Sequence, residues 1–137
     1  MTSDRAIFKS LREIEGKVSP HQDQINRALQ ARAEALDFVG DVRALAEFIG
    51  GKIEVLGRRE DWAISKEAFP GVKVYYIFHK GDEEFPARLS VLFSGERLNI
   101  ISGEDLAGMV IFTVSHMLRF VRETNQDKKL PEVVYRV

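Results

Sequence analysis

The segment VKVYYIFHKGDEEFPARLSVLFSG, residues 72–95, decides the fold, because its pattern is that of two strands joined by a turn. β-Branched and aromatic residues fill residues 72–79, and apolar residues alternate along residues 89–93. A glycine followed by acids is typical of a turn, and Pro86 cannot donate to a β-ladder, so it belongs at a strand start or on a sheet edge. We therefore predict an antiparallel hairpin whose tip carries Asp82, Glu83 and Glu84.

Shorter strand-like runs surround this hairpin. Residues 52–57 (KIEVLG) and 61–69 (DWAISKEAF) precede it, and residues 97–102 (RLNIIS) follow it as a further candidate strand. Pro131 opens a last short run, residues 132–137 (EVVYRV), which also has strand composition. These runs predict an antiparallel sheet of about four to five strands.

The chain before the first strand has the apolar spacing of helices. We predict a first helix over residues 3–15, with Ser3 as its cap and Gly16 as its stop. Ser19 and Pro20 then form a strong helix start, because Pro20 occupies the first helical position, where a missing N–H is harmless.

The second helix is expected to continue to Gly40, and Gln22 completes a capping box with its Ser19 cap. Asp41 caps a third helical piece, which the paired glycines Gly50 and Gly51 stop.

A long helix is predicted after the strands, beginning at Ser102 and running to about residue 125. Glu104 and Asp105 lie in its first turn, where the helix dipole favours acids. Its apolar surface is wide and includes Phe112 and Met117, and a helix that is apolar on most sides is buried on most sides. We expect it to lie between the sheet and either the N-terminal helices or a second subunit.

Together these elements predict an α+β fold: N-terminal helices, then an antiparallel sheet, then one long buried helix. The 137 residues fit a single domain, with a helical part over residues 1–50 and a strand-rich part over residues 51–137. No apolar run is long enough to span a membrane, and the first residues lack the apolar stretch of a signal peptide. We expect a soluble, cytoplasmic protein.

Composition restricts the chemistry and the partners. The chain contains no cysteine, so it can form neither a thiolate zinc site nor an iron–sulfur site by itself. Its net charge is -1, with acids and bases interleaved, and this pattern does not favour nucleic acid as a partner. A protein partner, above all a second copy of the chain, is the partner that we expect.

Three segments resemble the family known as domain of unknown function 3786, over about residues 42–120. The segments are ALAEFIGGKIEVLGRREDWAIS (44–65), FPGVKVYYIFHKGDEEFPARLSVLFSG (69–95) and ISGEDLAGM (101–109). The chain departs from the family where Ser94 and Gly95 follow Phe93, since an aspartate often follows there. The resemblance implies a compact α+β module without an assigned activity. Some members lie beside an iron–sulfur domain; because this chain has no cysteine, any such cofactor would have to lie on a partner.

Two groups of residues are candidate sites. Carboxylates are the ligands of hard cations, so Asp82, Glu83 and Glu84, completed by Glu104 and Asp105, could hold a divalent cation. A solvated turn is the alternative and is favoured, because neighbouring side chains in a turn diverge. The aromatic residues Phe85, Trp62 and Tyr75, with His116 on the late helix, could instead form a ligand or partner surface. Phe85 is expected to anchor the hairpin to the core.

Two functions follow as hypotheses. The first is a non-catalytic binding or assembly module that acts as a homodimer, suggested by the wide apolar surface of the late helix and by the lack of a recognisable catalytic motif. The second is a metal-binding module or metal-assisted enzyme that uses the acidic cluster at the hairpin tip.

Overall fold

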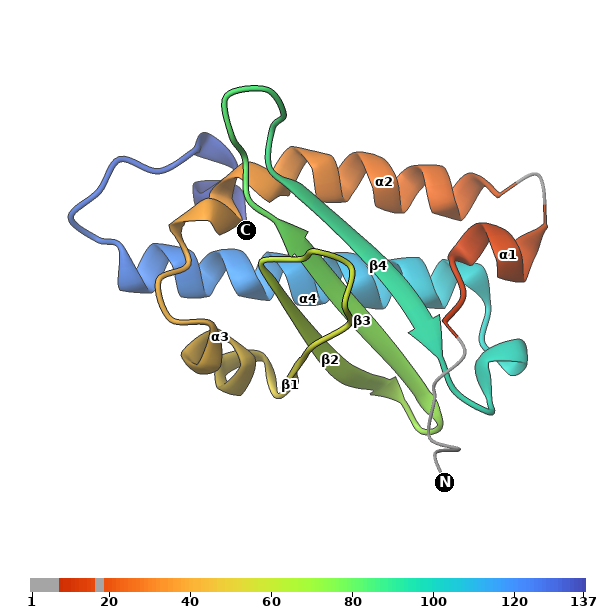
Figure 1. The fold of residues 1–137 in the computed structure, drawn as a ribbon. Coiled ribbons are helices and arrows are strands. Elements are labelled where there is room, and N and C mark those ends of the chain that lie inside the picture. The colour runs from red at the N-terminus through yellow and green to blue at the C-terminus, as the bar shows by residue number, and fades with distance from the viewer. Residues whose placement is uncertain (1–7, 17–18) are drawn as a thin grey trace.

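A four-stranded antiparallel sheet packs against a layer of helices in the computed structural model, which describes residues 8–16 and 19–137 (Figure 1). The strands follow one another in the sheet in chain order, so each pairs with the next. They are β1 (Lys52–Glu54), β2 (Trp62–Phe69), β3 (Val72–His79) and β4 (Arg88–Ser94). The α+β class, the antiparallel sheet and the long helix after the strands are all confirmed.

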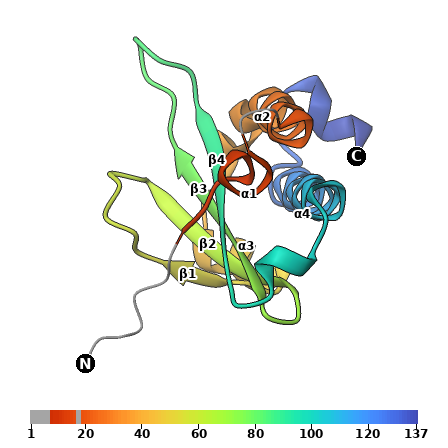
Figure 2. The same ribbon diagram turned by 90° about the vertical axis from the view of Figure 1, so that its right-hand side faces the viewer.

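The β3–β4 hairpin has the register that its sequence predicts. His79 lies opposite Arg88 in the pair next to the connecting loop, and Lys73 lies opposite Ser94 in the pair farthest from that loop. The loop between the two strands projects from the body of the molecule in both views (Figures 1 and 2). On the outer edge of β4, Lys9 forms an isolated bridge with Phe93, through N–H···O distances of 2.8 and 2.7 Å.

Two long helices lie side by side on one face of the sheet (Figure 2). They are α2 (Pro20–Ala33) and α4 (Gly103–Thr124), and the shorter α1 (Leu11–Glu15) and α3 (Val42–Ile49) pack beside them. Among the described residues no helix covers the opposite face, and the loop between β1 and β2 crosses in front of it (Figure 1). We call this the open face of the sheet.

The core lies between the sheet and the helical layer. Val72, Val74, Tyr76 and Phe78 alternate along β3 and are all fully buried, as their period of two predicts. Helix α4 contributes Leu106, Val110, Val114, Met117 and Val121 to the same core, and α2 contributes Ile25 and Leu29.

Most predicted caps are confirmed. The side chains of Ser19, Asp41 and Ser102 each accept a hydrogen bond from the backbone N–H three residues later. Gly50 ends α3 with φ of 75°, a left-handed conformation that glycine adopts without strain. In the part of the chain that the structure describes, no helix is both long enough and apolar enough to traverse a bilayer.

The N-terminal helices are shorter than the sequence suggests. Helix α1 begins at Leu11 and is capped by Ser10, whose side chain forms a reciprocal capping box with Glu13. The predicted cap Ser3 lies outside the described residues. Helix α2 ends at Ala33, and a 3₁₀ helix (Glu34–Phe38) continues toward Gly40.

The predicted capping box of α2 is only half formed. The Gln22 backbone donates to Ser19, but the Gln22 side chain turns to α1, where it accepts from the Arg12 N–H at 3.1 Å. Its amide donates to Asn26 at 2.9 Å. A contact between helices therefore replaces the local one.

Two predicted strands are wrong, because both segments form 3₁₀ helices: Leu98–Ile100 and Glu132–Arg136. After β4 the chain reverses at Gly95 (φ 132°), and the Arg97 N–H donates to the Gly71 carbonyl at 3.2 Å, which keeps the segment out of the ladder. The last segment buries Val134 and packs against α4, away from any sheet edge.

Candidate functional site

The outward side of α4 carries the most distinctive exposed surface. The side chains of Leu106, Val110, Val114 and Val121 point inward and are fully buried, whereas Phe112 is 69% exposed. A helix turns by about 100° per residue, so one stripe runs along the side opposite the core. We call the part of this stripe between positions 105 and 119 the outer stripe of α4; it consists of Asp105, Gly108, Met109, Phe112, Ser115, His116 and Arg119, and the exposed Glu123 follows it one turn later.

A hollow of about 340 Å³ adjoins the middle of the outer stripe. It is lined by Phe112, Ser115, His116 and Arg119 from α4 and by Val137 from the last segment. The His116 ring packs on Phe48 of α3, with ring centroids 4.7 Å apart. His116, one of the predicted surface residues, is therefore half-buried and held in place, and it forms one wall of this hollow.

The wide apolar surface of α4 is thus only partly covered by the chain itself. Helices α2 and α3 pack beside α4, which agrees with the prediction that the N-terminal helices would cover it. They leave the outer stripe open. Gly108 has open space around it, since a Cβ built there would meet no atom within 4 Å.

The hairpin tip forms a local turn that is closed by hydrogen bonds between Asp82 and the backbone of the next residues. The Asp82 carboxylate accepts from the N–H groups of Glu84 and Phe85, at 2.8 and 2.7 Å, and the Asp82 N–H donates to the Phe85 carbonyl. An aspartate that bonds the backbone in this way stabilises a turn by itself. The three acids are exposed, as the solvated-turn alternative expects.

The expectation that Phe85 anchors the hairpin to the core is wrong. Its side chain is 64% exposed. The backbone of Phe85, rather than its ring, makes the contacts that close the turn, and the buried residue at the start of β4 is Ala87. Phe85 instead lines a shallow hollow of about 460 Å³ between the hairpin and the end of α2, beside Glu34 and Asp37.

The five predicted metal ligands do not converge. Asp82 shares its hollow with Glu34 and Asp37, whereas Glu104 and Asp105 share one with His21 and Gln24 at the other end of α2. A helix of 14 residues is about 21 Å long, which separates the two groups. Among residues 8–16 and 19–137, no group of three or more His, Asp or Glu side chains has a metal-binding arrangement.

Two of the predicted surface aromatics are covered. Trp62 is 7% exposed, and its ring stacks on Phe78 at 5.0 Å on the core side of the sheet. Tyr75 lies on the open face but is only 5% exposed, because the Phe8 ring packs edge-on against it at 4.8 Å. Neither side chain offers a free surface to a ligand.

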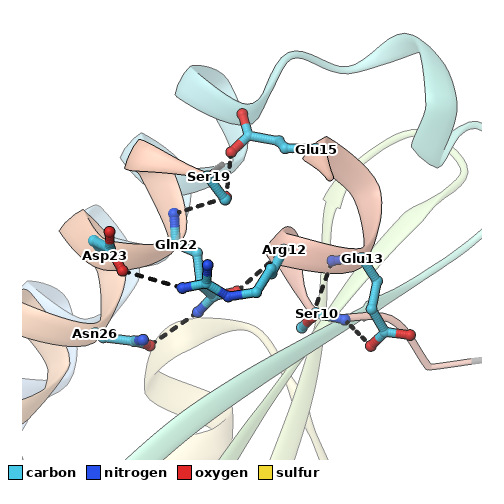
Figure 3. A network of polar contacts seen from close by, with 8 residues as sticks. All are labelled: Ser10, Arg12, Glu13, Glu15, Ser19, Gln22, Asp23 and Asn26. Carbon is cyan, nitrogen blue, oxygen red and sulfur yellow. Dashed lines mark hydrogen bonds and ion pairs between the residues drawn. The ribbon is translucent and has the colours of Figure 1, made fainter. Parts of the chain in front are cut away.

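A polar network joins α1 to the start of α2 (Figure 3). Arg12 pairs with Asp23 at 3.1 Å, and the Glu15 carboxylate accepts from the Ser19 hydroxyl and contacts His21 Nδ1, each at 2.6 Å. Burial alone would raise the pKa of Glu15, but these contacts with Ser19 and His21 outweigh it and hold the pKa below its usual range. The network fixes the N-terminal helices to each other.

The same carboxylate packs against the first residue of α4. A Cβ at Gly103 would lie 1.8 Å from Glu15 Oε2, so only glycine fits there without moving the carboxylate. An acid at a helix N-terminus also complements the helix dipole. Glu15 therefore lies in close contact with the beginning of α4.

Another polar group lies beneath α4. The Tyr76 hydroxyl is fully buried beside Thr113, and burial raises the pKa of Tyr76 far above its usual range. The hydroxyl has no hydrogen-bond partner of standard geometry in the described structure. A neutral tyrosine in this position packs as a core residue, and no hollow leads to it from the outer stripe or the hairpin.

Sequence patterns recognised Phe112 only as part of a wide apolar surface. They did not separate it from the inward residues, and they did not single out Gly108, Ser115 or Arg119. A helical projection contains the signal, since Phe112 falls opposite Val114 and Val121 and between two small residues, Gly108 and Ser115. The same projection places Asp105 seven residues before Phe112 and Arg119 seven residues after it, and Glu123 falls on the same side one turn further on.

The structure belongs to the α+β class. One face of its sheet is covered by helices, and the side of α4 that faces away from the core is exposed. The chain belongs to the DUF3786 family of domains of unknown function, because the model of that family matches residues 6–116. The match extends the resemblance through the N-terminal helices and confirms it. No curated protein and no solved structure matches the chain.

Proposed function

We propose that this chain is a non-catalytic assembly module that acts as a homodimer, joined through the outer stripe of α4. The observation that carries the proposal is the self-complementarity of that stripe. When two copies of α4 pack antiparallel across a two-fold axis at Phe112, residues equally far before and after Phe112 face each other. Such an isologous contact is the commonest way in which identical chains assemble.

Charge complementarity supports this register. Asp105 lies seven residues before Phe112 and Arg119 seven residues after it, and both are exposed. The antiparallel pairing therefore places Arg119 of each copy opposite the carboxylate at position 105 of the other. A parallel pairing would place like charges together and would be unfavourable.

Shape supports it as well. Gly108 lies four residues before Phe112 and faces His116 of the other copy, and Met109 faces Ser115. Small residues beside a large one let two helices approach to about 8–10 Å, the usual packing distance. The hollow beside Phe112 can then receive the Phe112 ring of the other copy, with His116 and Val137 as its walls.

The length of α4 and the exposed aromatic residues near it support a contact of this kind. A helix of 22 residues is about 33 Å long, and an aromatic side chain buries about 150–250 Å². Tyr135 is also exposed, and the last segment to which it belongs packs against α4. Aromatic anchors at the centre of an interface contribute most of the binding energy.

A cytoplasmic location is part of the proposal and is supported by the composition of the chain. The absence of cysteine fits a compartment in which thiols stay reduced and disulfides are rare.

Charge reversal tests the proposed register. Arg119→Glu should weaken the dimer, because it places two acids opposite each other in both symmetric contacts, and Asp105→Lys should weaken it likewise. Chains that carry both changes should dimerise again, since the pair is restored with reversed signs. The dissociation constant of each variant is measured by sedimentation equilibrium.

The matched control is Glu104→Lys, which changes the same charge in the same helical turn but off the outer stripe. It should leave the dissociation constant within about twofold of the original, because exposed pairs away from an interface contribute little. If Glu104→Lys weakens the dimer as much as Asp105→Lys does, or if the double variant is weaker than both single variants, the antiparallel register is wrong.

A further inference from the structure

A second hollow lies on the open face of the sheet, at the base of the β3–β4 hairpin. Its volume is about 270 Å³. Arg58 from the β1–β2 loop, His79 from β3 and Arg88 from β4 line it together with Ser90, and Ile77 and Leu92 give it an apolar floor. Among residues 8–16 and 19–137, no acidic side chain lines it. We propose that this hollow binds a small organic oxyanion, a carboxylate or phosphate attached to a compact apolar group.

The two arginines that line the hollow are not neutralised. In the part of the chain that the structure describes, neither Arg58 nor Arg88 forms an ion pair. The Arg58 guanidinium lies 5.8 Å over the Phe8 ring, a contact that positions it without cancelling its charge. Arginine has a planar set of donors that matches carboxylate and phosphate oxygens, which is why paired arginines are typical of oxyanion sites.

The acids closest in sequence are already engaged with the backbone. The Glu60 carboxylate accepts from the N–H groups of Leu56 and Arg58, each at 2.6 Å, and these bonds hold the pKa of Glu60 below its usual range although burial opposes them. The Asp61 carboxylate accepts from the Lys80 N–H at 2.7 Å. The positive charge in the hollow is therefore left for a ligand.

The loop that carries Arg58 is held in an unusual conformation. Arg59 has φ of 61°, a left-handed value that a residue with a Cβ rarely adopts. The Glu60 bonds and the contact between His79 Nε2 and the Arg58 carbonyl, at 3.2 Å, hold it in place. Strain that the surroundings maintain in this way is common at binding sites. His79 thus acts as a positioning residue for Arg58.

The apolar floor indicates what else the ligand carries. Ile77 and Leu92 lie next to each other on β3 and β4, because Ile77 pairs with Ser90 and Leu92 with Tyr75 along the same ladder. An inorganic ion would leave this floor in contact with water. A ligand with an aromatic or short aliphatic group beside its oxyanion covers it and binds more tightly.

Titration with three probes at constant ionic strength tests the proposal: phenyl phosphate, benzoate and inorganic phosphate. Chemical-shift changes of backbone amides report both the affinity and the place of binding. We expect phenyl phosphate or benzoate to saturate with a dissociation constant of ~1 mM or below, with shifts around Arg58, His79 and Arg88. Inorganic phosphate should bind at least ~fivefold more weakly, and the tighter of the two organic probes identifies the oxyanion.

The variants Arg58→Ala and Arg88→Ala should each weaken the organic probes by about tenfold or more, because each removes a charge-assisted contact. The matched control is Arg43→Ala, an exposed arginine on α3, which should change the affinity by less than about twofold. Shifts that grow linearly without saturation, affinity that both arginine variants retain, or inorganic phosphate binding as tightly as the organic probes would each overturn the proposal.

Discussion

Phe112 and Phe85 are almost equally exposed, at 69% and 64%, and each lines a hollow, but they lie on different kinds of element. Phe112 lies midway along a helix of 22 residues whose opposite side is buried and whose first residue packs against Glu15. Phe85 lies in the loop between β3 and β4, in a turn that the Asp82 side chain closes. This loop projects from the body of the molecule (Figure 2). The comparison teaches that two equally exposed rings can have different support: Phe112 lies on a long helix packed against the core, and Phe85 lies in a loop. In our proposal, the ring on the packed helix is the one that contacts a second copy.

The largest expected effect is a difference in the free energy of unfolding between substitutions on the buried side and on the exposed side of α4. Met117 is fully buried, and Met117→Ala should lower the free energy of unfolding by ~2–5 kcal/mol, because it opens a cavity in the core. Phe112→Ala, measured at concentrations where the chain is a monomer, should change it by less than ~0.5 kcal/mol. Urea denaturation followed by circular dichroism measures both. A large loss for Phe112→Ala in the monomer would mean that its ring supports the fold and is not free for a partner.

The next effect is a difference between Phe112 and Phe85 in how their substitution changes the dimer dissociation constant. Phe112→Ala should raise the dimer dissociation constant by about 30-fold or more, which corresponds to the ~2 kcal/mol or more of a central aromatic contact. Phe85→Ala should leave it within about twofold. Sedimentation equilibrium over a concentration series gives both constants. Equal effects of the two substitutions would remove the distinction between the rigid stripe and the turn.

A smaller effect concerns the hairpin tip. Asp82→Ala should lower the free energy of unfolding by ~1 kcal/mol, because two backbone N–H groups lose their acceptor. Glu84→Ala and Phe85→Ala should each change it by less than ~0.5 kcal/mol, since both side chains are exposed. Thermal melts with and without chelator check this. Stabilisation by Glu84→Ala, lost on adding a divalent cation, would instead indicate crowded carboxylates at a cation site.

The smallest effect depends on pH and concerns the polar contacts of Glu15 with Ser19 and His21. Because the folded pKa of Glu15 lies below its usual range, its contacts stabilise the protein above about pH 4.5, and this contribution is lost as the pH falls through the folded pKa. Glu15→Gln should therefore be less stable than the original chain near pH 5.5, and the difference should shrink toward about pH 3.

The control for the pH effect is Glu47→Gln, an exposed carboxylate on α3. It should show a small difference that stays the same at both pH values. Urea denaturation at the two pH values measures it. A Glu15→Gln difference that does not change with pH would show that the side chain acts by packing rather than by charge.

Much of the fold could be predicted from the sequence because its signals are local. The alternation in β3, the caps Ser19, Asp41 and Ser102, and the left-handed stop at Gly50 are each determined within a few residues. The 3₁₀ segments were missed because apolar β-branched runs such as residues 132–137 suit a strand equally well. Tertiary packing of Val134 against the core decides between the two structures.

The candidate site could be predicted only in part, because it depends on what covers each residue. Trp62, Tyr75 and Phe85 have the same aromatic character in the sequence, but the first two are buried and the third is exposed. Arg58 and Arg88 come from distant segments that only the folded sheet brings to one hollow. His116, predicted as a ligand or partner surface residue, lines a hollow together with its helical neighbours Ser115 and Phe112, and its role there stays a prediction.

The mass of the protein in solution tests the central claim most directly, measured by light scattering for the original chain, Phe112→Glu and Phe85→Glu at tens of micromolar. A buried charge without a partner is unfavourable in an interface, so it should disrupt the dimer only at the outer stripe. We predict twice the chain mass of 15.6 kDa for the original chain and for Phe85→Glu, and 15.6 kDa for Phe112→Glu. A mass of 15.6 kDa for the original chain, or a dimer that Phe112→Glu leaves intact, would contradict it.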